Sequence, residues 1–447
     1  MSSNNGQGLA DKTMGSSLRA LNWIAGSTIL DRLGIRSQFE RTVFQGTKHG
    51  MRAATSAGRT FRKASTLGKP ARQNSGSASG LFDLTPDDEQ QMFIEAGRAF
   101  AADQLRPAAA EADGQKATPQ EVLDQASEIG VNTLGVPEEF DGVLTEQSAT
   151  TWTLMAEALA HGDMGIAYAA LAPGAVATAI GRWGDPDQQA TYLPAFTGEE
   201  PPAAALALLE PRALFDPFTL DTTAIPAADG SWILSGVKSL IARPGDCELF
   251  VVAAATGDGQ PALFIVESGA EGLGTEPEPA MGLRAASTGR LVLEKVRVPE
   301  GAVIGDETDR SRIYADCVAG SRVAWAAMST GTSQAVLDYV IPYVNERKAF
   351  GEPVSNRQSV AFSVSDIAIE TGGMRLANWR AASRSDRGDS FHREAALARR
   401  LAAAKGMDIG SAGVQLLGGH GYVTEHPVER WYRDLRAAGV MEGALLA

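Results

Sequence analysis

The sequence predicts an α+β protein with an N-terminal α-helical domain, a middle antiparallel β domain and a C-terminal α-helical bundle. Apolar residues recur with the helical period up to about residue 198 and again from about residue 311. Between these blocks, short apolar or alternating runs are separated by Gly, Pro and Asp, which is typical of strands. Blocks of different type argue against a doubly wound βαβ fold. The expected boundaries are 81–205, 206–304 and 305–447, after an extension of residues 1–80.

The extension is basic, whereas the rest of the chain is acidic. Residues 1–80 hold twelve Lys and Arg against three acidic residues, a net charge of +9, so the remainder carries -23 of the total of -14. An apolar stripe at helical spacing, with arginines between, predicts a basic amphipathic helix over residues 17–45, and residues 64–80 have the composition of a flexible linker. Three interpretations remain open, namely a solvated tail, an anchor to anionic lipid or a partner, and a cleaved transit peptide.

Composition excludes several classes of function. An acidic body argues against nucleic acid as the main ligand, because phosphate contacts need clustered positive charge. Cys247 and Cys317 are far apart in sequence, so neither a disulfide framework nor a structural zinc site is expected. We read no apolar run as long as the roughly 18–20 residues that span a bilayer. The expected location is the cytoplasm, with possible membrane-surface contact through residues 1–80.

The individual elements follow from local signals. Thr85 is a predicted N-cap, with Pro86 at the first helical position. Strands are predicted at residues 231–242, 248–256, 261–268 and 289–299. After residue 311, one stripe with spacing 4, 3, 4, 3 predicts a core-facing helix, and its residues are Val360, Val364, Ile367, Thr371 and Met374. No GxGxxG follows a predicted strand, so a Rossmann nucleotide site has no support.

Three motifs resemble those of the acyl-CoA dehydrogenase family over residues 81–447. They are ERKAFGEPVSNRQ (346–358), QLLGGHGYVTEHPVERWYRD (415–434) and GLRAASTGRLVLEKVRVP (282–299). They occur in the family's order, on the α–β–α layout already predicted. The resemblance implies FAD shared between subunits of a homo- or hetero-oligomer (dimer or tetramer). It also implies an acyl-CoA substrate and electron-transfer flavoprotein as the electron acceptor, with an oxidase using oxygen as an alternative.

The resemblance assigns cofactor roles to two segments. Arg347, Phe350 and Gln358 are expected near the adenosine and pyrophosphate of a neighbouring subunit's flavin, and Gln415, Gly418 and Gly419 are expected to cradle the same end. Arg offers a bidentate fork to phosphate oxygens, and glycine lets the backbone approach a ligand closely.

The resemblance also implies a catalytic base. Removal of the proton beside a thioester carbonyl requires a carboxylate in a dry pocket. In the family this Glu lies eight residues after an Arg-Asp pair, and here Arg433-Asp434 leads by that count to Glu442. The alternative family position falls on Ser321, which has no carboxylate, and the following Arg322 is a candidate for the acyl-CoA pocket. The five histidines show no triad or metal-ligand pattern, and we assign them no role.

The contacts expected around the flavin ring are altered. Leu209, Leu214 and Phe215 replace two hydroxyl residues and a glycine, Leu240 replaces an aromatic residue, and Ala242 replaces a third hydroxyl residue. Each ring atom left unpaired costs about 1–3 kcal/mol, so the pattern indicates a filled or vacant apolar pocket.

Three hypotheses follow from this combination. The first is an active FAD-dependent acyl-CoA dehydrogenase of fatty acid metabolism with a remodelled pocket, and the second is a catalytically impaired or half-site partner subunit of a hetero-oligomer. The third is an acyl-CoA-binding scaffold recruited to membranes by the basic extension.

Overall fold

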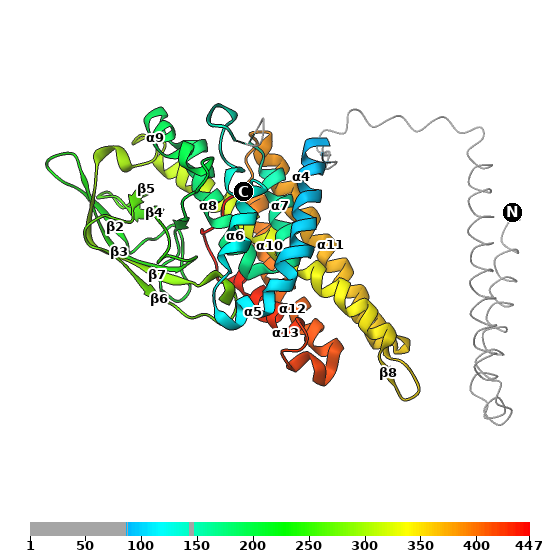
Figure 1. The fold of residues 1–447 in the computed structure, drawn as a ribbon. Coiled ribbons are helices and arrows are strands. Elements are labelled where there is room, and N and C mark those ends of the chain that lie inside the picture. Colours follow the sequence, from blue (N-terminus) through cyan, green and yellow to red (C-terminus); the bar gives the residue numbers. More distant parts are fainter. Residues whose placement is uncertain (1–85, 87, 143–146) are drawn as a thin grey trace, which may run out of the picture. The chain divides into compact units, whose positions relative to one another are not determined.

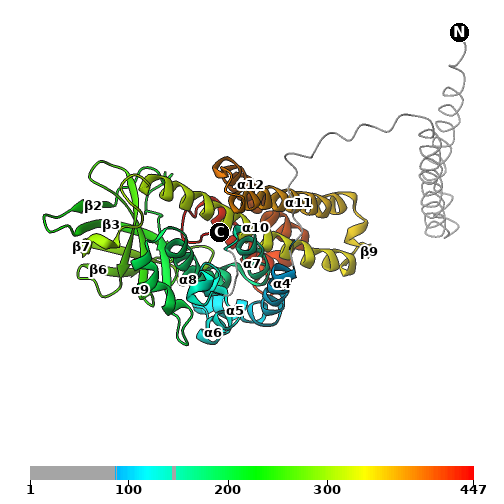
Figure 2. The same ribbon diagram turned by 90° about the horizontal axis from the view of Figure 1, so that it is seen from above.

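The computed structural model describes residues 86, 88–142 and 147–447, and these described residues form one compact unit (Figure 1). The predictions for residues 1–80 and for the N-cap at Thr85 lie outside the described residues. In both views the larger sheet lies at one end of the unit and a small hairpin lies at the opposite end, with helices between them (Figure 1, Figure 2).

The first helical block contains seven main segments. They are α4 (Asp88–Phe100), a π-helical turn (Ala101–Leu105), α5 (Arg106–Gln115), α6 (Gln120–Glu128), α7 (Ala149–Gly162), α8 (Met164–Trp183) and α9 (Pro186–Phe196). Asp163 starts α8 by accepting the backbone N–H groups of Gly165 and Ile166, both at 3.0 Å. Asp185 and Gln188 form a capping box on α9.

Helix α8 corrects one expectation from the sequence. Its 20 residues are long and apolar enough to cross a bilayer by length and composition, although we read no such run. Small Ala and Gly residues supply much of its apolar character and permit close packing on all sides. Because 89% of its most apolar window is buried inside the protein, α8 is a core helix.

The middle block is a seven-stranded sheet. Its strands are β1 (Ala204–Ala207), β2 (Thr223–Pro226), β3 (Trp232–Ile241), β4 (Leu249–Ala255), β5 (Pro261–Glu267), β6 (Leu273–Pro277) and β7 (Gly289–Val298). The order is β1-β4-β2-β3-β7-β6, and β5 pairs with β4. The four predicted strands are β3, β4, β5 and β7. Most pairs are antiparallel, but β4 pairs in parallel with β1 and, at one residue, with β2. The long connection between β1 and β4 permits this parallel pairing.

The last block is helical. It contains α10 (Arg310–Glu346), the hairpin of β8 (Lys348–Ala349) and β9 (Glu352–Pro353), α11 (Gln358–Asp386), α12 (His392–Leu417) and α13 (Val428–Leu435). The predicted stripe lies on α11, where Ile367, Thr371 and Met374 are buried against the bundle.

The chain then turns inward. Residues 441–447 are all buried, and in both views the C-terminus lies among the helices (Figure 1, Figure 2). Met441 and residues 444–447 belong to the core cluster that also contains residues of α8, α10 and β1.

Candidate active site

Glu442 lies between two arginines. The Arg322 guanidinium on α10 donates to both carboxylate oxygens, with Nε and Nη2 each 3.2 Å from one of them. The Arg399 Nε on α12 lies 3.0 Å from Oε1. Glu442 is only 7% exposed. Burial lowers the pKa of Arg399, and the Glu442 charge opposes that shift. The structure therefore brings Glu442 and Arg322 together, and it adds Arg399, which the sequence did not indicate.

The residue after Glu442 is anchored to α10. The Gly443 carbonyl accepts hydrogen bonds from the Ser321 hydroxyl at 2.8 Å and from the Trp325 indole N–H at 2.7 Å. Trp325 also packs edge-on against Tyr168 of α8, with ring centroids 5.1 Å apart. Ser321, which lacks the carboxylate of a base, thus holds the loop that carries Glu442.

Two of the altered ring-side positions lie in the apolar core. Leu209 and Ala242 are buried in the same core cluster as Leu445 and Leu446. The backbone of Ala444 bridges to Leu206 of β1. A Cβ added to Gly443 would lie 2.4 Å from the Leu208 Cβ, so the two segments are in direct contact. At Leu209 and Ala242 the side chains are therefore packed in an apolar core.

The other ring-side positions differ in exposure. Leu214 is 99% exposed and has a positive φ of 54°. Leu240 is half-buried, and its backbone is fixed by the Tyr168 hydroxyl, which donates to its carbonyl at 2.8 Å, and by Glu278, which accepts its N–H at 2.8 Å.

A buried ion pair supports the altered segment. The Lys238 ammonium lies 2.9 Å from Glu210 Oε1, and Glu210 also accepts the backbone N–H groups of Asp221 and Thr222. Burial lowers the pKa of Lys238 to about 8, against the opposing effect of Glu210. The sequence did not indicate this pair, although Glu210 follows Leu209 and Lys238 lies two residues before Leu240.

The predicted cofactor residues lie on the surface. Arg347, Phe350 and Gln358 lie at the end of α10, in the hairpin and at the start of α11, and all three are exposed. Phe350 is 97% exposed and lies under the Arg357 guanidinium. Gln415, Gly418 and Gly419 at the end of α12 are exposed too, and open space surrounds Gly418, whose φ is 59°.

Two tyrosine–histidine contacts tie these segments together. The Tyr343 hydroxyl lies 2.9 Å from His420 Nδ1 and donates to the Leu417 carbonyl at 3.3 Å. The Tyr343 carbonyl in turn accepts the Arg347 N–H. The Tyr339 hydroxyl lies 2.7 Å from His426 Nδ1. Two histidines without an assigned role therefore position the Gly418–Gly419 loop beside the end of α10.

The two groups of predicted residues occupy separate places. Arg322 lies on α10 and Arg347 directly follows its last residue, 25 positions later, which corresponds to roughly 37 Å along a helix. One small ligand does not reach from the Glu442 cluster to the exposed loops. The exposed loops, whose backbone is accessible, are compatible with one end of FAD, whereas Leu208 and Gly443 are in direct contact with each other. In the described part of the chain, no group of three His, Cys, Asp or Glu is arranged to hold a metal ion.

Comparison with known proteins identifies the family. Three acyl-CoA dehydrogenase domains match in order, the N-terminal domain over residues 87–200, the middle domain over 205–296 and the C-terminal domain over 312–445. The acryloyl-CoA reductase (NADH) of Anaerotignum propionicum is 31% identical over 372 residues, 81% of this chain and 93% of its own length. The mouse mitochondrial short-chain specific acyl-CoA dehydrogenase is 31% identical over 80% of this chain and 87% of its own.

A solved structure agrees with these relatives. The butyryl-CoA dehydrogenase of Megasphaera elsdenii superposes with a TM-score of 0.75 at 28% identity, over 81% of this chain and 96% of its own. The predicted fold class is confirmed, and so is the predicted enzyme class, that of flavoprotein oxidoreductases acting on CH–CH bonds. With three consecutive domain matches and relatives that cover four-fifths of its length, the chain belongs to the acyl-CoA dehydrogenase family.

Proposed function

We propose that this chain is a subunit of a hetero-oligomeric acyl-CoA dehydrogenase, in which its exposed loops bind the adenosine end of a flavin whose ring lies in a partner subunit. Arg347, Phe350 and Gln358 would contact that flavin together with the Gln415–Gly419 loop. The substrate class is an acyl-CoA thioester, and the short-chain names among the relatives favour a short acyl group. Electron-transfer flavoprotein is the acceptor that we expect for the assembled enzyme.

One observation carries this proposal. Residues 441–447 pack directly on β1, just before the altered ring-side positions begin, and leave Leu206, Leu208 and Leu209 buried among apolar side chains. A flavin ring carries polar atoms, and each one buried without a partner costs about 1–3 kcal/mol. Three lost hydroxyl groups and a filled space together oppose ring binding in this chain, whereas the exposed loops remain open to a ligand.

Flavin content tests the proposal. We expect the chain purified alone to contain far less than one FAD per subunit after denaturation. Co-expression with a homologue that keeps the hydroxyl and aromatic residues at the ring-side positions should give a coloured complex with about one FAD per pair of chains. Arg347→Ala should lower the flavin content of that complex, and Arg393→Ala, which alters another exposed arginine, should leave it unchanged. One FAD per chain in the protein expressed alone would contradict the proposal.

A second candidate function is dehydrogenation by this chain itself, with Glu442 as the base. The observation that favours it is the position of Glu442, which is buried beside Arg322 where the motif spacing predicts the base. When FAD is bound, it accepts the hydride from the β-carbon. In this mechanism Glu442 removes the α-proton, and residues 441–447 have to move away from Leu208 to admit the substrate.

The variant Glu442→Gln distinguishes the two functions. If Glu442 is the base, turnover of butyryl-CoA by a flavin-containing complex should fall at least about a hundredfold while flavin content is retained. If Glu442 serves only to neutralise Arg322 and Arg399, the variant should keep turnover and lose about 1–3 kcal/mol of stability, measured by urea unfolding. Glu346→Gln, at the exposed end of α10, is the control and should change neither quantity.

A further inference from the structure

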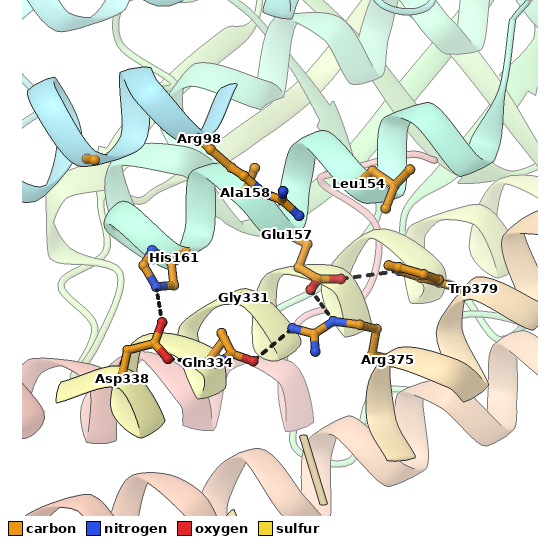
Figure 3. Close-up of a pocket in the computed structure, with 11 residues that line it drawn as sticks. Arg98, Leu154, Glu157, Ala158, His161, Gly331, Gln334, Asp338, Arg375 and Trp379 are labelled. Atoms are coloured by element: carbon orange, nitrogen blue, oxygen red, sulfur yellow. Dashed lines mark hydrogen bonds and ion pairs between the residues drawn. The ribbon is translucent and has the colours of Figure 1, made fainter. Parts of the chain in front are cut away.

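A cavity of about 580 Å³ lies among four helices of the two helical blocks. It is shown in Figure 3, with side chains from α4, α7, α10 and α11 and from the π-helical turn after α4. It shares no residue with the Glu442 cluster or with the exposed loops. A volume in this range is typical of sites for small organic ligands.

Most charged groups in the cavity wall neutralise one another. Glu157 on α7 accepts hydrogen bonds from Arg375 Nε and, at 3.3 Å, from the Trp379 indole (Figure 3). Arg375 also donates to Gln334, and Gln334 donates to Asp338 at 2.9 Å. These side chains form a hydrogen-bonded row along the cavity wall, which runs from Glu157 through Arg375 and Gln334 to Asp338.

His161 completes the row. Its Nε2 lies 2.9 Å from Asp338 Oδ2, and its backbone carbonyl accepts a hydrogen bond from Arg106. Each carboxylate of the row thus has a cationic or polar partner on at least one oxygen, and the row holds two carboxylates against one arginine and one histidine.

Arg98 is the exception. It lies on α4 at the solvent-exposed edge of the cavity, and among the described residues its guanidinium has no hydrogen bond or ion pair. Figure 3 shows its side chain extending from α4 along α7, with no interaction drawn to the other labelled residues. A guanidinium without a partner beside an apolar wall is suited to bind an anion.

Small side chains keep the rest of the wall apolar and open. Ala102, Leu154, Ala158 and Gly331 supply this surface. Gly331 permits the close approach of α10 to α7, because a Cβ there would lie 2.0 Å from the Glu157 carbonyl oxygen. Ala102 belongs to the π-helical turn, a feature that often occurs at functional sites.

We propose that this cavity binds a small organic monoanion, a carboxylate on an aliphatic body, with the carboxylate on Arg98 and the body on the apolar wall. A polyphosphate needs several free cations, and Arg98 is the one wall cation without a partner in the described part of the chain. This site would be separate from any site for the acyl-CoA thioester, so it does not depend on the function proposed above.

Calorimetric titration of the full chain with sodium octanoate, 1-octanol and octylammonium chloride tests this site. We expect saturable octanoate binding, with octanol and octylammonium at least about tenfold weaker. Arg98→Gln should weaken octanoate about tenfold or more and leave octanol unchanged, whereas Arg393→Gln, the same change on an exposed position of α12, should have no effect.

A second variant separates this cavity from other apolar sites. Ala158→Phe should fill the cavity and abolish binding of both octanoate and octanol, with folding checked by the thermal transition. Absence of saturable octanoate binding to the unaltered chain would overturn the proposal. Octanoate affinity that is equal in the unaltered chain and in Arg98→Gln would also overturn it, because the binding would then lie elsewhere.

Discussion

Asp434 and Glu442 lie eight residues apart in one motif, but their carboxylates have different surroundings. Glu442 has two guanidinium groups within 3.2 Å. Asp434 is fully buried and accepts the backbone N–H of Leu283 at 2.6 Å, which ties the sheet domain to α13. Its neighbour Asp163 is the carboxylate paired with Arg430 at 3.0 Å. Asp434 therefore has a structural role, and its titration should make the free energy of unfolding depend on pH.

The contribution of Asp434 to stability changes with pH in one direction. Burial, together with the charge of Asp163, raises the pKa of Asp434 to about 7. In the unfolded chain this carboxyl group has a pKa of about 3.9. Between these values the folded protein binds more protons than the unfolded chain, so this group's contribution to stability falls as pH rises and is least favourable above about pH 7.

Asp434→Asn removes this titration and keeps an oxygen for the Leu283 N–H. Relative to the unaltered chain, the variant should be more stable at pH 8 than at pH 5 by at least about 1 kcal/mol, measured by urea unfolding at both values. Asp103→Asn changes an exposed acid and should show no such difference. A stability difference for Asp434→Asn that is the same at both pH values would contradict the prediction.

Among the helices, the contact of α10 with α7 depends on one glycine. At Gly331 a methyl group would overlap the Glu157 backbone, so Gly331→Ala forces the two helices apart or strains them. We expect this variant to lose about 1–3 kcal/mol of unfolding free energy. Gly372→Ala on α11 is the matched control, because nothing lies within 4 Å of the added carbon. It should gain roughly 0.5–1 kcal/mol, and equal effects of the two variants on the urea midpoint would contradict this account.

The helices and strands were largely predictable, because the spacing of apolar residues and the capping and turn residues specify them. The α11 stripe and strands β3, β4, β5 and β7 follow directly from the sequence pattern. The parallel pairing of β1 with β4 was not predictable, since it depends on where a distant segment returns. Two ion pairs were not predictable for the same reason. Arg399 and Glu442 are 43 positions apart in the chain, and Glu157 and Arg375 are 218 positions apart.

The candidate site was predictable only where the family resemblance supplied positions. It placed Glu442 and Arg322, which the structure brings together, and its departures at Leu209 and Ala242 indicated an apolar pocket. The burial of residues 441–447 could not be derived, because it depends on packing against α8, α10 and β1 together.

At the scale of the whole molecule, one apolar face of α11 is exposed to solvent. Phe362, Ile369 and Leu376 recur every seven residues, so they share one face, and they are 59%, 69% and 57% exposed. The face begins beside Gln358, one of the residues that we expect to contact a shared flavin. An aligned row of large apolar side chains of this kind indicates contact with another chain.

Ile369→Lys tests this surface, since a charge in the middle of an apolar contact has to be desolvated without a partner. By light scattering coupled to size exclusion, the variant should have a smaller mass than the unaltered oligomer. The co-expressed complex should also lose flavin, because the exposed loops and the flavin ring would then belong to separated chains. Ile225→Lys replaces another exposed isoleucine, on β2, and should keep both mass and flavin. If Ile369→Lys keeps its mass but loses flavin, this face touches the cofactor rather than a neighbouring chain. If it keeps both, assembly uses another surface.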